Sequence, residues 1–324
     1  MKPLKYIVVR LLGLLLVAAV AQIIHQRWVY PSIKKSEGWL QAMVERRLEK
    51  KSNFLYFSAS TNTAFAPDDS ITLSISDLLQ QNIQQAVNVI DTSAIHGGIF
   101  LKILQKIPEN QFPKTIVMDL NLRSFGANWI HSDLENSLQR NFVYWNERPS
   151  LLNHLFAATK WYDYKSPNEH LRAIEYQQKF ERLPFNHPTI KKWCDSLFQT
   201  VNYSEDGKTM IEHFGFHIQS DNQQLKNFEA IVALAKSHES KLILVLLPEN
   251  VEKMKLLVDQ QLPALIEKNA EFLTNHFKKM GVLVIDLHAK LPKESFFEAF
   301  PTEHYNAFGR QIVATAIAGK LPKK

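Results

Sequence analysis

The sequence predicts a doubly wound α/β domain with a parallel sheet of about five strands, preceded by an N-terminal transmembrane helix. Five short apolar runs, separated by longer segments of helical spacing, are the main observation. Such continuous runs are typical of parallel strands that are covered on both faces. The hydrophobic content of 45% is sufficient for a full core. The roughly 290 residues after the leader suit one large domain or a domain with an insertion.

The N-terminal segment, residues 1–30, predicts a membrane anchor. Its first ten residues include three basic side chains: Lys2, Lys5 and Arg10. The apolar run 11–24 follows and, counted from Tyr6, reaches the ~20 residues that a bilayer span requires. Trp28 and Tyr30 would lie at the opposite interface as aromatic anchors.

Cleavage and orientation of this segment stay open. Residues 19–21, Ala-Val-Ala, form a pattern that a signal peptidase recognises, so cleavage before Gln22 would give a soluble exported protein. We favour the uncleaved anchor because Ile23 and Ile24 continue the apolar run. The basic residues that follow nearly balance those of the leader: Arg27, Lys34 and Lys35. The positive-inside rule therefore does not decide the orientation.

Residues 31–52 are expected to form an amphipathic linker helix, because apolar side chains recur there at helical spacing. The α/β domain is expected over 53–320. Its predicted strands are 54–57, 87–90, 115–119, 241–247 and 282–287. Its predicted helices are 98–107, 225–238, 255–280 (with Pro263 early in it) and 306–318.

The gap between the third and fourth predicted strands holds an insertion, approximately residues 129–224. It is rich in aromatic residues and histidine without a clean strand pattern, so we expect it to be largely helical and irregular. An insertion that leaves a strand of such a sheet is placed to form a wall or lid over the ligand crevice, which lies at the carboxyl ends of the strands.

The composition excludes several classes of function. The net charge of +6 is spread along the chain without a basic block, which argues against nucleic acid as a partner and favours a membrane or an anionic glycopolymer.

Cys194 is the only cysteine, so no intramolecular disulfide or CxxC metal site exists. Phosphate-binding loops and dinucleotide fingerprints are absent, and no cofactor is expected. His213 and His217 have the spacing of a helical zinc pair, but Gly215 between them argues against a helix.

Three polar residues follow predicted strands at the edge where parallel sheets build their sites. Ser60 lies in a small polar turn after the first strand, where the alternative role is a helix N-cap. Asn121 comes just after the third strand, where the alternative is a turn former. His304 lies in a loop ahead of the final helix, where a surface or capping residue is the alternative.

Together with the pattern His-x-Asn-x-x-Gly over 304–309, these residues resemble the SGNH (GDSL-like) hydrolase superfamily. The anchor and the insertion make the chain similar to its membrane-anchored envelope branch, which contains DltD, the D-alanyl transfer protein of teichoic acids, and alginate acetylation proteins. The resemblance implies that Ser60 is the nucleophile and His304 the general base. It further implies oxyanion donors from Asn121 and from the backbone N–H of Ser93, which replaces the usual glycine.

The family's acid stands three residues before the histidine, and that position is Pro301 here. Proline cannot orient an imidazolium, so the expected triad is incomplete. Glu303, Asp286 and Glu298 are the nearby acids, of which Glu303 is adjacent to the histidine. A Ser-His dyad can still catalyse.

The resemblance therefore implies a membrane-anchored serine esterase or O-acyltransferase without a cofactor. It would act outside the cytoplasm on acyl esters of an envelope glycopolymer, beside a membrane-bound acyltransferase partner. The alternative is a catalytically inactive protein of the same fold that binds a polymer or a membrane partner during envelope assembly.

Overall fold

The computed structural model describes residues 2–37, 39–49, 52–93, 95–130, 145, 151, 188–194, 196–199, 202–297 and 303–321. The chain separates into two compact units, one of Met1–Arg46 and Leu134–Tyr176, the other of Arg47–Asp133 and Gln177–Lys324. The second unit is the α/β domain. Each unit is described by itself.

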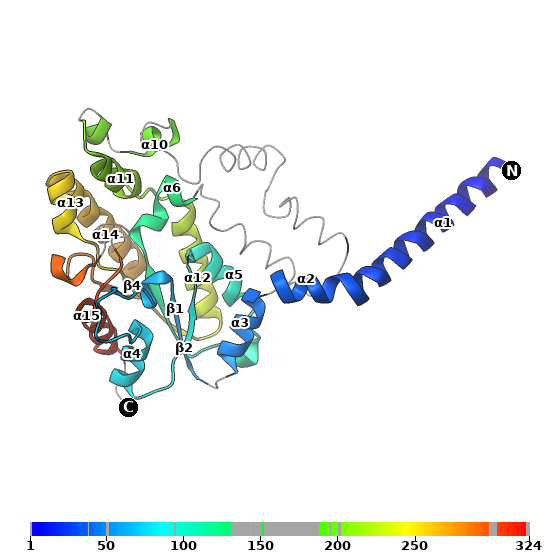
Figure 1. Cartoon of the computed structure of the whole chain (residues 1–324), viewed down its shortest axis with the longest axis horizontal. Helices are drawn as coiled ribbons and strands as arrows, with labels where there is room; N and C mark the ends of the chain where they lie inside the picture. The colour runs from blue at the N-terminus through cyan, green and yellow to red at the C-terminus, as the bar shows by residue number, and fades with distance from the viewer. Residues whose placement is uncertain are drawn as a thin grey trace. The chain divides into compact units, whose positions relative to one another are not determined.

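The α/β unit is built on a five-stranded sheet in the order β2-β1-β3-β4-β5, and every neighbouring pair is parallel. Figure 1 shows the labelled strands at its centre. The strands are β1 (Phe54–Ser58), β2 (Asn88–Asp91), β3 (Thr115–Leu120), β4 (Lys241–Leu246) and β5 (Leu283–Asp286). The predicted doubly wound α/β class and all five predicted strands are confirmed. The chain crosses from β2 to the far side of β1 to form β3, so the strand order reverses beside β1, where ligands bind in such sheets.

Helices α4 (Ile75–Ile83) and α15 (Ala307–Ala318) cover one face of the sheet. Side chains of both helices join one core cluster with Tyr56, Val117 and Ile243 of the strands. Consecutive strand residues point to opposite faces, so Phe57 points to the other layer. There its ring packs on Phe100 of α5 (Gly97–Leu104), with ring centroids 5.1 Å apart.

The second layer continues through α12 (Gln223–Ser237) and α14 (Gln261–Lys279), where Phe228 and Phe277 make an edge-to-face contact. The described remainder consists of short helices. They are η2 (Ser60–Asn62), η3 (Glu109–Gln111), η4 (Leu122–Phe125), α6 (Ala127–Ile130), α10 (Pro188–Trp193), η6 (Ser196–Gln199), α11 (Glu205–Phe214), α13 (Val251–Leu257) and η7 (Lys293–Ser295).

The prediction of one helix over 255–280 is wrong, because the chain breaks between α13 and α14. Asp259 has φ +152°, outside helical geometry, and its carboxylate accepts a hydrogen bond of 2.6 Å from the N–H of Gln261. That contact lies just ahead of α14, whose N-cap residue is Gln260. Pro263 then falls in the first turn, where its missing N–H is not required. Helix α4 was not among the predicted helices, although Ser74 and Asp77 form a capping box at its start.

The other unit begins with α1 (Lys2–Ile24), continues through a π-helical segment (His25–Val29) into α2 (Tyr30–Glu37), and α3 (Trp39–Leu48) follows. Within the described residues, the stretch Lys5–Ser32 is long and apolar enough to span a membrane, and none of its most apolar window is buried. The expected apolar N-terminal helix is confirmed. Most of the predicted insertion at 129–224, by contrast, lies outside the described residues.

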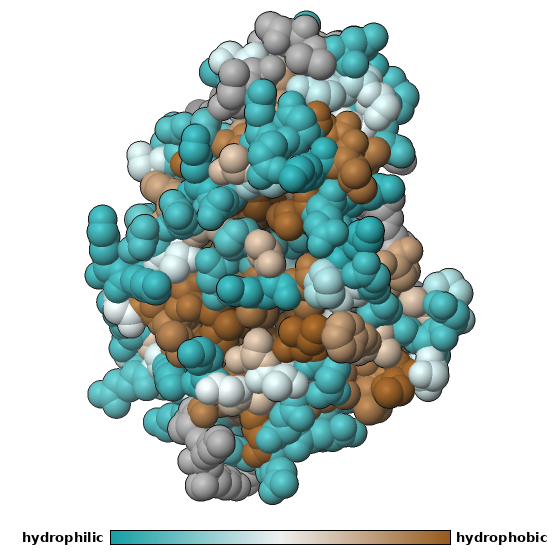
Figure 2. All heavy atoms as spheres, turned by 90° about the vertical axis from the view of Figure 1, so that its left-hand side faces the viewer, coloured by the Kyte–Doolittle hydropathy of each residue, from teal (hydrophilic) through white to brown (hydrophobic). Residues whose placement is uncertain are grey.

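Figure 2 views the chain from the left-hand side of Figure 1 and shows patches of hydrophobic surface between hydrophilic side chains. The large apolar side chains that are exposed in the described part of the α/β unit are Phe65, Ile71, Leu256, Leu283 and Phe308. Single exposures of this kind are ordinary for a folded surface.

Candidate active site

Ser60 is presented by the turn that follows β1. The strand ends at Ser58, Ala59 is extended, and Ser60 opens the one-turn helix η2. The side chain of Asn62 holds this turn in place, because it donates to Asp91 at the end of β2 (2.6 Å) and accepts from the N–H of Ser76 (2.8 Å). Ser60 is half-buried, so its hydroxyl is held by the turn and still reaches the surface.

His304 lies in the loop before α15, and its Nε2 is 3.2 Å from the Oγ of Ser60. The loop is held on both sides. Tyr305 is fully buried and donates its hydroxyl to the carbonyl of Pro248 (2.9 Å), while the ring of Phe297 stacks on the imidazole at 5.9 Å. Two side chains that are 244 positions apart in sequence thus meet within hydrogen-bond distance.

The pattern His-x-Asn-x-x-Gly has a physical basis in this loop. Asn306 caps α15 by accepting a hydrogen bond of 3.1 Å from the N–H of Gly309 and donates to the carbonyl of Glu294 (2.6 Å). A Cβ on Gly309 would lie 2.8 Å from the backbone oxygen of Ser295. The glycine therefore allows α15 to approach η7, and the asparagine begins the helix directly after the histidine.

Arg310, a fully buried residue of α15, joins the loop of Ser60 to the loop of His304. Its guanidinium donates to four backbone carbonyls and one carboxylate: those of Ala64, Ile71, Leu73 and Tyr305, and that of Asp69. The N–H of Ala64 also bonds the carbonyl of Ser60 (2.8 Å). One buried side chain thus ties the backbone after the serine to the backbone after the histidine.

Asn121 follows β3 and contacts the residue beside the histidine. Its Nδ2 donates to Oε1 of Glu303 (2.9 Å), and its Oδ1 accepts from the N–H of Arg123 (3.0 Å). The guanidinium of Arg123 forms a buried ion pair with the same oxygen of Glu303. The carboxylate of Glu303 is therefore directed to Asn121 and Arg123, whereas the sequence placed it as a candidate partner of His304.

The remaining predicted site residues are less closely connected. Ser93 lies on an exposed turn after β2. Asp286, another candidate acid, instead bonds Nδ1 of His288 at the end of β5 (2.7 Å). Burial alone would raise the pKa of Asp286, but the hydrogen bonds and charge of His288 outweigh it and lower that pKa. Pro301 and Glu298 lie outside the described residues.

A buried polar cluster between β1 and β3 was not identified from the sequence. Asp119 in β3 accepts hydrogen bonds from the hydroxyls of Ser58 and Tyr56. Burial raises the pKa of Asp119 to about 7, against the lowering effect of these two bonds. Burial, followed by the charge of Asp119, also raises the pKa of Tyr56 well above its ordinary value. The sequence gives no local signal for this cluster, because the partners of Asp119 lie 61 and 63 positions away.

The histidine pair considered for zinc is separated. His213 lies in the last turn of α11 and is buried, whereas His217 lies beyond the end of that helix at Gly215 and is exposed. Among the described residues, no group of three or more histidine, cysteine or acidic side chains is arranged to hold a metal ion.

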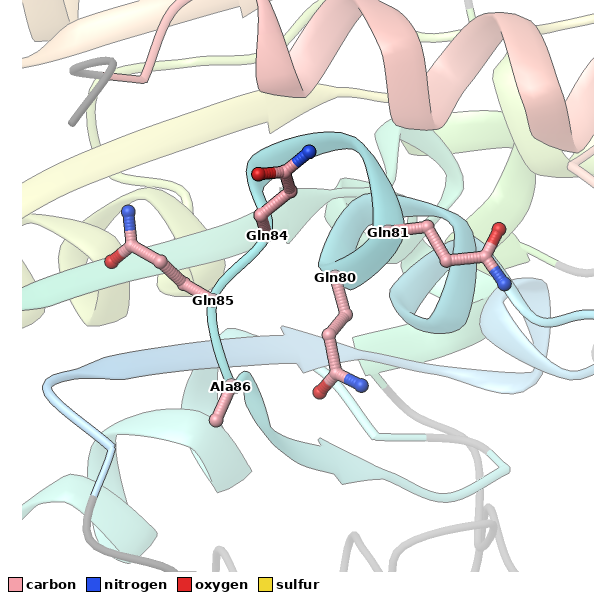
Figure 3. A pocket seen from close by; sticks show the side chains of 5 residues that line it. All are labelled: Gln80, Gln81, Gln84, Gln85 and Ala86. Carbon is pink, nitrogen blue, oxygen red and sulfur yellow. The ribbon is translucent and has the colours of Figure 1, made fainter.

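An open pocket of about 380 Å³ lies elsewhere, at the end of α4 and the loop into β2. Four glutamines and one alanine line it: Gln80, Gln81, Gln84, Gln85 and Ala86 (Figure 3). This loop precedes β2 and therefore lies at the amino edge of the sheet, while Ser60 and Asn121 follow strands at the carboxyl edge. The pocket is separate from the Ser60–His304 pair.

No protein-family model matches the chain, and the search of curated proteins found no match. Among solved structures, the chain is similar to a lipolytic protein of the G-D-S-L family from Desulfitobacterium hafniense, with 10% identity, 83% of this chain and 100% of the other covered, and a TM-score of 0.40. It is also similar to a lipase/acylhydrolase from Enterococcus faecalis, with 12% identity and a TM-score of 0.36; the match covers 84% of this chain and 97% of the other. A third similar structure is an acetyl-xylooligosaccharide esterase from Geobacillus, with 12% identity and a TM-score of 0.39; the match covers 83% of this chain and 94% of the other. Because these identities and TM-scores are low, the fold is assigned from the strand order and the parallel pairing of the sheet.

Proposed function

We propose that the chain is a serine esterase or O-acyltransferase of the SGNH type in which Ser60 is the nucleophile and His304 the general base. The observation that carries this proposal is the 3.2 Å separation of Ser60 Oγ and His304 Nε2 at the carboxyl edge of a parallel sheet. A nucleophile and a base within hydrogen-bond reach, each held by its own structured loop, are the minimum that acyl transfer requires.

The reaction would proceed in two halves. Ser60 Oγ attacks the carbonyl carbon of an acyl ester while Nε2 of His304 takes its proton, and this requires the tautomer with the other proton on Nδ1. The tetrahedral intermediate expels the leaving alcohol, which receives the proton from His304. Water then attacks the acyl-serine in an esterase, or a sugar hydroxyl in a transferase, with His304 again moving the proton.

The oxyanion would be held by the side-chain amide of Asn121 and by backbone N–H groups near Ser60 and Ser93. Each such donor contributes about 3–4 kcal/mol to lowering the barrier in well-studied enzymes. In this proposal, Glu303 does not serve as the third member of a triad, because Arg123 and Asn121 already hold its carboxylate.

We assign the enzyme to the outer side of a cell membrane and an envelope glycopolymer as the acyl carrier, in the manner of DltD and the alginate acetylation proteins. The apolar stretch Lys5–Ser32 supports an uncleaved single-pass anchor. The positive net charge of +6 supports an anionic polymer as the acyl carrier. A tether of this kind would keep the acyl-handling serine beside polymers that are assembled at the membrane.

A fluorophosphonate probe on the detergent-solubilised full-length protein tests the nucleophile. Wild type is expected to be labelled, Ser60→Ala is not, and Ser237→Ala, which changes an exposed serine at the end of α12, is labelled like wild type. Absence of labelling in a folded wild type would contradict the enzyme and favour the non-catalytic, polymer-binding alternative.

A further inference from the structure

We propose that Glu303 and Arg123 are positioning residues that orient Asn121 as an oxyanion donor. This inference rests on the proposed function and adds a role for an ion pair that the Ser-His chemistry does not itself use. The pair links the loop of His304 to the turn after β3, across 180 positions of sequence.

The contacts fix which way the amide of Asn121 faces. Its Oδ1 accepts from the N–H of Arg123 at 3.0 Å, and its Nδ2 donates to the carboxylate of Glu303 at 2.9 Å. A flipped amide would set Oδ1 against the carboxylate and NH₂ against the N–H, so that both contacts would be repulsive. The Nδ2 of Asn121 carries two hydrogens, and only one of them is donated to Glu303. In the fixed orientation the second N–H is left for a substrate oxygen.

The burial of these groups supports a fixed geometry. Glu303 is 0% exposed and Arg123 is 8% exposed, while Asn121 is half-buried. The guanidinium of Arg123 also lies 4.6 Å above the ring of Trp129. The donor therefore reaches the surface from a buried and packed support, which limits the reorganisation that an oxyanion would otherwise require.

The charge of Arg123 has a separate consequence. A lone carboxylate touching an oxyanion donor would repel the negative charge that develops on the substrate oxygen. Arg123 donates to the same oxygen of Glu303 that Asn121 contacts, so the local charge is balanced. Glu303 can then hold the amide with a smaller electrostatic penalty on the transition state.

Because Glu303 would act only through Asn121, a double-mutant cycle separates positioning from other roles. The readout is the second-order rate of fluorophosphonate labelling in full-length protein. Asn121→Ala is expected to slow labelling by about 10²–10³-fold, the loss typical of one oxyanion donor. Glu303→Ala is expected to slow it about tenfold to a hundredfold in the wild-type background, and by less than twofold in the Asn121→Ala background.

Glu303→Gln supplies the second test, because its side-chain oxygen can still accept from Asn121 while its charge is lost. We expect it to label faster than Glu303→Ala, whereas a residue needed only for the ion pair would give equal rates for both. Equal losses from Glu303→Ala in both backgrounds, with labelling still dependent on Ser60, would overturn the positioning role and leave the proposed function intact. A wild type that is folded but never labelled would overturn both.

Discussion

Asp119→Asn is expected to change how the stability of the protein depends on pH. The carboxyl is buried and has a pKa of about 7, against an ordinary value of 3.8. The folded state therefore binds this proton more tightly than the unfolded chain does. The stabilising effect of this bound proton is complete below the ordinary pKa of the carboxyl and is lost as the pH rises through about 7.

The size of the effect follows from linkage. Once both states are ionised, the loss is on the order of 4 kcal/mol, and about 2–3 kcal/mol of it falls between about pH 5 and about pH 8. For a domain of this size that corresponds to a fall in melting temperature of roughly 4–12 °C. Asparagine cannot ionise, and its amide can accept from Tyr56, so the variant should lose this part of the pH dependence.

The assay is thermal unfolding of the full-length protein in detergent across that range of pH, for wild type and Asp119→Asn. Asp286→Asn is a control of opposite sign, because the contacts with His288 lower the pKa of Asp286. Its stabilising effect is present above the ordinary pKa and is lost as the pH falls through the lowered value, so the control should be less stable near neutral pH. If the melting temperatures of wild type and Asp119→Asn change with pH by the same amount, the raised pKa of Asp119 is contradicted.

Three further predictions follow from the same structure. Arg310→Met removes the buried guanidinium that joins the loops of Ser60 and His304, and Asp69 is left without its buried cation. The free energy of unfolding, measured by denaturant titration, should fall by about 3–5 kcal/mol. A loss below about 1 kcal/mol would argue against this role of Arg310. Gly309→Ala should cost about 1–3 kcal/mol, because its Cβ would meet the backbone of Ser295 at 2.8 Å, whereas Gly319→Ala at the other end of the helix, with no neighbour closer than 3.4 Å, should be tolerated. Alkaline phosphatase fused to the C-terminus should be active in cells if the domain is exported, and an inactive but stable fusion would contradict the extracytoplasmic placement.

The sheet could be predicted from sequence because each strand is a continuous apolar run bounded by polar turns. The helix breaks could not. Between α13 and α14, Asp259 has a backbone angle outside helical geometry, and its carboxylate accepts from the N–H of Gln261. The apolar periodicity continues on both sides of this residue, so nothing in the sequence signals the break. Helix α4 was also missed, because its nine residues span too few turns for a clear apolar periodicity.

Ser60, Asn121 and His304 could be proposed from sequence because each directly follows or precedes a recognisable element at the same edge of the sheet. Their supporting residues could not. Glu303 and Arg310 act through partners more than 170 positions away along the chain, and no local pattern signals which buried charge meets which. Residues 298–302, which include Pro301 at the position where the resemblance to SGNH hydrolases would place an acid, lie outside the described residues.

The most direct test of the central claim is the site and rate of covalent modification. Wild type and His304→Ala are treated with a fluorophosphonate, and the adduct is located by peptide mass spectrometry. We expect an adduct on Ser60 in wild type and a rate at least about 10³-fold lower in His304→Ala, because the base that takes the serine proton is gone. An adduct on another residue, or equal rates in the two proteins, would contradict it.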